Sequence, residues 1–182
     1  MFGYSILRSS LNSQNKKNGA ENKNASGTNF FNELFDQLAA FNIPLEGIHT
    51  ETGPGVYEAA IKYSGIMDAA DKAVLFKTAV KEIGYRNNII ASFMAKWNAS
   101  LPGCGGHVHQ SLWDVSKKKN LFYEAPGKSK KKDAMSELMR QYIAGQIYCL
   151  PHILQIYAPT INSYKRLVTG MWAPTTLTWA VD

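Results

Sequence analysis

The sequence predicts an α+β fold in which helices back an antiparallel-rich sheet. Two observations carry this prediction. Three segments repeat apolar residues at helical spacing, and the runs between them have the length and turn residues of short strands. The chain has 182 residues and is 45% hydrophobic, which is single-domain length with enough apolar surface for a core. The three amphipathic helices argue against an all-β barrel.

Residues 12–29 are rich in Asn, Lys, Ser and Gly. This composition cannot bury apolar surface, so we expect an exposed polar loop there. From Asn29 onward the spacing predicts a helix that ends before Pro44 and covers the sheet. Its apolar stripe comprises Phe31, Leu34, Phe35, Leu38 and Phe41.

The sheet is predicted to begin with a hairpin, because residues 45–51 and 56–63 read as short strands and residues 52–55 (TGPG) as a tight turn. This hairpin carries three carboxylates and a histidine: Glu46, Glu51, Glu58 and His49. Carboxylates on a short hairpin are commonly just solvated. Together, however, these groups are a candidate set of hard ligands for Mg²⁺ or Mn²⁺.

A second helix is predicted with Asp68 as its N-cap, Asp71 in its first turn and an end near Gly84. We expect Met67 to lie in the core. The buried stripe of this helix comprises Ala69, Ala73, Phe76, Val80 and Ile83. Residues 89–97 follow as an apolar run with a single charge, Lys96, which predicts a central strand.

Residues 101–114, LPGCGGHVHQSLWD, combine a glycine-rich turn with two histidines and a serine at alternate positions. If HVHQS is extended, His107, His109 and Ser111 lie on one face of the strand. Three polar side chains would then face one space. We expect a bound metal or phosphate there, and the alternative is a plain buried strand.

A third helix is predicted after Ser136, interrupted at Pro151 and then resumed. Its apolar side comprises Leu138, Met139, Tyr142, Ile143 and Ile147. Residues 162–168 read as a polar loop in which Arg166 could make a bidentate contact with a carboxylate or phosphate. Residues 175–182 have strand composition and stop at the last residue, so we expect an incomplete chain.

The formal charge of +6 lies mostly in lysine clusters at residues 16–17, 117–119 and 128–132. They lack interleaved aromatics, so solvated loops explain them better than nucleic acid does. No run of about 18 apolar residues and no cleavable leader occurs, so we expect no membrane span. The two cysteines, Cys104 and Cys149, are too few for a disulfide framework, and a reducing, cytoplasmic location is expected.

Three rival chemistries compete with a metal or phosphate strand. A phosphate-binding P-loop needs GxxxxGK[ST], which does not occur in this sequence. Cys104 as a thiol nucleophile has no placed base beside it. A metal oxygenase of the HxH type, with Asp114 as its downstream acid, is the sharper rival, although the helices disfavour its β-barrel.

Three motifs in order, HTETGPGVYE, LPGCGGHVHQSLWD and APTINSYKRLV, resemble the glutamine synthetase superfamily. The resemblance runs from Phe2 to Asp182 apart from the Asn/Lys-rich insertion, and it makes residues 1–182 part of that family's catalytic domain. It implies a curved, antiparallel-rich sheet backed by helices. It also implies glutamine biosynthesis: the γ-carboxylate of glutamate attacks ATP, and ammonia then displaces phosphate from γ-glutamyl phosphate at two divalent metals, Mg²⁺ or Mn²⁺.

The resemblance also implies roles for individual residues. Glu51 and Glu58 match ligands of the first metal, and His107 matches a ligand of the second. Four residues match nucleotide or phosphate contacts: Tyr4, Glu46, His109 and Ser111. Gly103 matches the glycine whose backbone meets the amino-acid substrate, where a Cβ would block close approach, and Arg166 matches the arginine that holds a substrate carboxylate.

Two departures concern the amine acceptor. Trp172 stands where the family usually has a glutamate that helps to form the ammonium site, and Pro102 stands where an asparagine often precedes Gly103. Both make the pocket more apolar, which brings an alkylamine or polyamine ligase of the same superfamily close behind an ammonia ligase. The non-catalytic lens relatives are disfavoured, because they usually lose metal or nucleotide residues.

Two segments of the family have no counterpart in residues 1–182: an earlier strand with two metal carboxylates, and a later arginine-containing segment. We therefore expect the isolated chain to bind nucleotide weakly and to turn nothing over. The full-length form is expected to be a homo-oligomer, because the family forms double rings.

Overall fold

The computed structural model describes residues 2–10, 23–125, 134–170, 173 and 175, which divide between two compact units, Met1–Val108 and His109–Asp182. In the first unit five strands form one sheet: β1 (Phe2–Ser10), β2 (Leu45–Thr50), β3 (Val56–Ile61), β4 (Ile89–Ser92) and β5 (Gly106–Val108). The sheet order is β2-β3-β1-β4, β5 also pairs with β1, and every pairing is antiparallel. The predicted α+β class with an antiparallel-rich sheet is confirmed.

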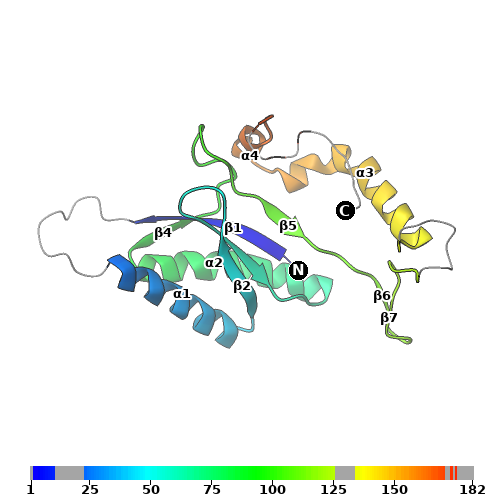
Figure 1. The fold of residues 1–182 in the computed structure, drawn as a ribbon, viewed down its shortest axis with the longest axis horizontal. Helices are drawn as coiled ribbons and strands as arrows, with labels where there is room; N and C mark the ends of the chain where they lie inside the picture. The colour runs from blue at the N-terminus through cyan, green and yellow to red at the C-terminus, as the bar shows by residue number, and fades with distance from the viewer. Residues whose placement is uncertain (1, 11–22, 126–133, 171–172, 174, 176–182) are drawn as a thin grey trace, which may run out of the picture. The chain divides into compact units, whose positions relative to one another are not determined.

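Two helices, α1 (Lys23–Ala40) and α2 (Ile66–Arg86), lie along one face of this sheet (Figure 1). Their inner residues and the sheet form one apolar core, in which a fully buried large side chain contributes roughly 1.5–3 kcal/mol. The largest fully buried side chains are Phe76, Leu34, Leu38, Ile43, Ile61, Ile83 and Val80. The stripe predicted for the second helix is buried as expected.

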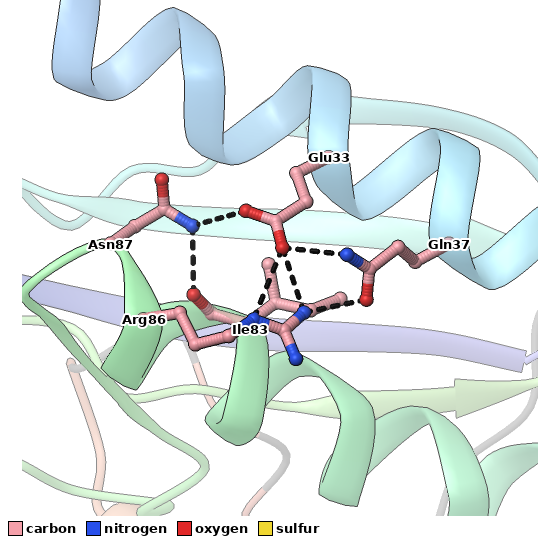
Figure 2. A network of polar contacts seen from close by, with 5 residues as sticks. All are labelled: Glu33, Gln37, Ile83, Arg86 and Asn87. Atoms are coloured by element: carbon pink, nitrogen blue, oxygen red, sulfur yellow. Dashed lines mark hydrogen bonds and ion pairs between the residues drawn. The ribbon is translucent and has the colours of Figure 1, made fainter.

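A polar network ties the two helices together (Figure 2). Glu33 of α1 accepts hydrogen bonds from Arg86 Nη2 at 2.7 Å and from Asn87 Nδ2 at 2.6 Å. Arg86 Nη2 also donates to Gln37 Oε1 at 2.5 Å. The hydrogen bonds from Asn87 and Arg86 hold the pKa of Glu33 below its usual value. The network therefore fixes the end of α2 against the middle of α1.

Both helices differ from the prediction at their ends. The first begins at Lys23 rather than after a loop to residue 29. Its first residues have low helix propensity, but adding a residue to a helix that has already formed needs no new nucleus. Its inner face is Phe30, Leu34 and Leu38, whereas Phe35 and Phe41 are 39% and 59% exposed. The second has Gly65 rather than Asp68 as its N-cap and ends at Arg86. Met67, expected in the core, is 73% exposed.

Competition for one edge of β1 shortens two predicted strands. β4 pairs with the second half of β1, up to Leu7 opposite Ser92, and β5 takes the first half, from Tyr4 opposite Gly106. The chain must leave the sheet between them, so the predicted central strand over residues 89–97 is wrong beyond Ser92. The strand predicted through Ser111 likewise ends at Val108, which pairs with Phe2 at the start of β1.

The second unit holds a small hairpin, β6 (Trp113–Asp114) with β7 (Lys119–Asn120), and two helices, α3 (Glu137–Tyr157) and α4 (Ile161–Arg166). Ser136 caps α3 as predicted, accepting from the Met139 amide at 3.1 Å. Pro151 lies inside α3, and non-helical angles at Ile153 mark a kink, which agrees with the predicted interruption.

The predicted polar loop over residues 162–168 is wrong for most of its length, because α4 ends only at Arg166. Thr160 caps α4 and accepts from the Ser163 amide at 3.3 Å, a cap that stabilises even a short helix. The strand predicted over residues 175–182 lies outside the described residues apart from Thr175. Within the part of the chain that the structure describes, no helix has the length and apolar character to cross a membrane.

Candidate metal and substrate site

The face of the sheet away from the helices carries polar side chains of β2 and β3. Along β3, Ala59 and Ile61 are buried in the core, so the alternating residues Glu58 and Ala60 point to the opposite face. His49 of β2 pairs directly with Glu58. Paired residues of antiparallel strands project to the same face, so the register brings an imidazole beside a carboxylate.

Three side chains converge at this point: His49, Glu51 and Glu58, called here the hairpin cluster. One ligand atom from each lies within 4.8 Å of the other two. His49 Nδ1 is 3.6 Å from Glu51 Oε1, and His107 Nδ1, from β5, is 3.7 Å from Glu58 Oε1. Two carboxylates flanked by two imidazoles fit a divalent cation such as Mn²⁺ or Mg²⁺.

The turn after β2 holds Glu51 in place. The Glu51 amide donates to the Val56 carbonyl at 2.9 Å, and the Val56 amide donates to the Gly53 carbonyl at 3.1 Å. A Cβ added at Gly53 would lie 2.8 Å from Val56 Cγ2, closer than real atoms approach. The TGPG turn was predicted correctly, and this contact favours glycine at position 53, while Gly55 has a positive φ of 73°.

The electrostatics of the hairpin cluster favour a bound cation. Burial raises the pKa of Glu58, contact with the Glu51 carboxyl raises it further, and the two histidines act against this rise. Two neighbouring, partly buried carboxyl groups cost free energy when both are ionised. A cation between them would remove that cost, because its charge offsets both.

The other predicted site residues of the first unit lie outside the hairpin cluster. Glu46 is exposed on β2 at a register shift between Leu45 and Gly47, outside the hairpin cluster. The backbone of Tyr4 lies in β1, and its side chain is outside the described part of the chain. Pro102 and Gly103 are half-buried in the turn before β5.

Three of the predicted residues that the structure describes belong to the second unit. His109 and Ser111 are exposed and follow the end of β5, and Ser111 Oγ accepts from Trp113 Nε1 at 3.0 Å. The single-strand arrangement predicted for His107, His109 and Ser111 is therefore wrong beyond Val108. Arg166 is the last residue of α4. Trp172 lies outside the described residues.

Comparison with known proteins decides the family. The family model described as "Glutamine synthetase, catalytic domain" matches residues 4–182. The chain belongs to the glutamine synthetase family. The membership predicted from the three motifs is thereby confirmed.

Relatives within the glutamine synthetase family show the extent of the match. "Type-1 glutamine synthetase 2" of Dictyostelium discoideum is 49% identical over 182 residues, which are 100% of this chain and 31% of the relative. "Glutamate--isopropylamine ligase" of a Pseudomonas species is 36% identical over 87% of this chain and 33% of its own length. The chain thus spans about a third of the length of these curated relatives.

A solved structure confirms the fold of this glutamine synthetase family member. Plasmodium falciparum glutamine synthetase superposes with a TM-score of 0.75 at 22% identity, over 93% of this chain and 39% of that one. The predicted catalytic-domain architecture, present in part, is therefore confirmed.

Sequence reasoning missed one feature beside the site. Lys96 is buried in the loop between β4 and β5, and it donates a hydrogen bond to the Leu101 carbonyl. The sequence feature that could have indicated its burial is that Lys96 is the single charged residue in the apolar run of residues 89–97. That signal indicates that the lysine is unusual, but only the folded loop supplies its partner.

Proposed function

We propose that the chain supplies part of the active site of an ATP-dependent glutamate–ammonia ligase. In this reaction the γ-carboxylate of glutamate attacks the γ-phosphate of ATP, ADP leaves, and ammonia displaces phosphate from γ-glutamyl phosphate to give glutamine. The observation that carries the proposal is the hairpin cluster beside His107, because Glu51, Glu58 and His107 stand at positions that the family motifs assign to metal ligands.

In this proposal Glu51 and Glu58 hold one Mg²⁺ or Mn²⁺ and His107 holds a second. A bound divalent cation offsets the charge of the polyphosphate and of the transferred phosphoryl group. His107 Nδ1 lies 3.7 Å from Glu58 Oε1, so the two cation positions of the proposal would be neighbours. His49, on the other side of Glu58, helps to orient the Glu51 carboxylate, 3.6 Å from it.

The remaining roles in the proposal concern the substrates. Tyr4, Glu46, His109 and Ser111 contact the nucleotide, the backbone of Gly103 meets glutamate, and Arg166 holds its carboxylate by a bidentate contact. Arg166 ends α4, and a helix terminus gives a long side chain a fixed base. In this proposal the full-length protein is cytoplasmic and assembles as a homo-oligomer in the form of a double ring.

A ligase for an alkylamine or polyamine is the second candidate. Pro102 and Trp172 favour it, because neither offers the polar group expected near ammonium. The 36% identity to a relative whose name specifies isopropylamine also supports it. A non-catalytic structural relative is a weaker candidate, since the cluster's potential metal ligands are retained.

The experiment that tests the function uses a chimaera. The 182 residues replace the matched segment of the Dictyostelium relative, which spans this whole chain, and phosphate release is measured with ATP, glutamate and each amine. We expect release that requires glutamate, Mn²⁺ or Mg²⁺ and an amine, with ammonia as the better acceptor, and none from the isolated chain. Preference for isopropylamine would select the second candidate, and a chimaera that folds and binds metal but never releases phosphate would refute both.

A further inference from the structure

Lys96 is the one buried charged side chain among the residues that the structure describes, with 7% of its surface exposed. Burying an ammonium is costly unless hydrogen-bond acceptors replace its water. Its Nζ donates to the carbonyl oxygen of Leu101 at 2.6 Å. This hydrogen bond couples the position of the Leu101 carbonyl to the buried ammonium.

That acceptor lies in a loop without regular strand structure. The loop is closed at its base by the Cys104 amide, which donates to the Ala95 carbonyl at 2.9 Å. At its far end the Ser100 amide donates to Asn98 Oδ1 at 2.8 Å. Between these points, the bond from Lys96 crosses the loop to the residue just before Pro102. The path of the chain through Pro102 and Gly103 therefore depends on the lysine.

The same loop lies against the turn that carries the hairpin cluster. A Cβ added at Gly53 would meet the Pro102 carbonyl oxygen at 3.7 Å, an ordinary contact distance. Gly53 is two residues after Glu51 and is buried. A shift of residues 101–103 would thus change the distance between the Gly103 backbone and the carboxylates of the cluster.

We propose that Lys96 is a positioning residue for the amino-acid substrate. Its ammonium fixes the 101–103 turn, so that the Gly103 backbone meets glutamate at a set place beside Glu51 and Glu58. Lys96 acts through Leu101 and not through contact with the substrate. This inference rests on the proposed function, and it predicts an effect on glutamate without one on ATP.

Kinetics of the chimaera test the inference. Lys96→Met keeps an unbranched side chain one atom shorter and removes the donor, and Lys62→Met makes the same change at an exposed lysine after β3. We expect Lys96→Met to raise KM for glutamate on the order of tenfold or more, because small misplacements of binding groups have large effects. KM for ATP should stay within about twofold, and Lys62→Met should match the parent chimaera. Lys96→Arg keeps a charged donor, so its KM for glutamate should fall between the two.

Amide hydrogen exchange of the 182-residue chain supplies a readout that needs no activity. Lys96→Met should accelerate exchange at Gly103 and Cys104 and leave the β2–β3 amides unchanged. Equal exchange in Lys96→Met and Lys62→Met would overturn the inference. So would an unchanged KM for glutamate in an active chimaera, or an equal rise in both KM values. A parent chimaera without any activity would instead count against the proposed function, and the exchange result would still decide the role of Lys96. Lys96→Arg covers the case in which Lys96→Met does not fold.

Discussion

Glu58 links the chemistry of the site to the stability of the fold. Burial and the neighbouring Glu51 raise the pKa of its carboxyl above the ordinary value of 4.5, so the folded state holds a proton more tightly than the unfolded state does. Stability contributed by this group is therefore present at low pH and lost as pH rises through the folded pKa. At neutral pH the ionised group is a cost that a bound cation would remove.

The substitution Glu58→Gln should separate these two effects. Without metal at pH 7 we expect the variant to be as stable as the parent chain or up to about 1 kcal/mol more stable, because a partly buried charge beside a second carboxylate is removed. The difference should disappear at about pH 4, below the unfolded pKa of 4.5. Mn²⁺ should raise the Tm of the parent chain and not that of the variant, since only binding to the folded state stabilises it.

Thermal unfolding with and without Mn²⁺ measures this prediction, and Glu82→Gln on the exposed side of α2 is the matched control. The control should keep the Mn²⁺ response. An equal Tm rise in Glu58→Gln and in the parent chain would contradict a role for Glu58 in metal binding.

At the scale of elements, the site depends on how the helices hold the sheet. Glu33 of α1 is the centre of the network with Gln37, Arg86 and Asn87. It therefore fixes the end of α2, from which β4 starts three residues later. Exposed ion pairs contribute little, but several hydrogen bonds share this one carboxylate.

Glu33→Ala should lower the free energy of unfolding by about 1–2 kcal/mol, because it leaves Arg86 and Asn87 without their shared acceptor. The effect should shrink as pH falls below 4.5, the ordinary pKa of a glutamate, since the folded pKa of Glu33 is depressed and its contribution is lost on protonation. Urea unfolding at pH 7 and at about pH 3.5 measures both values. A loss equal to that of Glu82→Ala would show that the network contributes nothing specific.

At the scale of the whole molecule, sequence patterns correctly predicted the features that depend on residues close together in the chain. The TGPG turn and its flanking strands, the buried stripe of α2 and the Ser136 cap follow from residues close in sequence, and all three were predicted. The three motifs also identified the family. The convergence of His49, Glu51 and Glu58 follows from the register of one short hairpin, so a sequence pattern could indicate it.

The errors arise where distant segments compete. The length of β4 and the end of β5 depend on which half of β1 each one occupies, and no pattern within residues 89–111 contains that information. The hydrogen bond of Lys96 could not be predicted for a similar reason, because its acceptor, the Leu101 carbonyl, is brought near it only when the loop closes. The start of α1 was predicted too late in the chain, because the polar composition of residues 12–29 indicated a loop although the helix extends into that segment. His109 and Arg166 lie in the second unit, so the pairing of β2 with β3 does not determine their positions.

We propose that residues of this chain form a divalent-cation site on the face of the sheet away from the helices. The most direct measurement is paramagnetic broadening of the amide resonances of the 182-residue chain by Mn²⁺. We predict broadening centred on His49, Glu51, Glu58 and His107, reversed by chelation and absent from Glu58→Gln. Broadening centred elsewhere, or spread evenly over the exposed carboxylates, would contradict the claim.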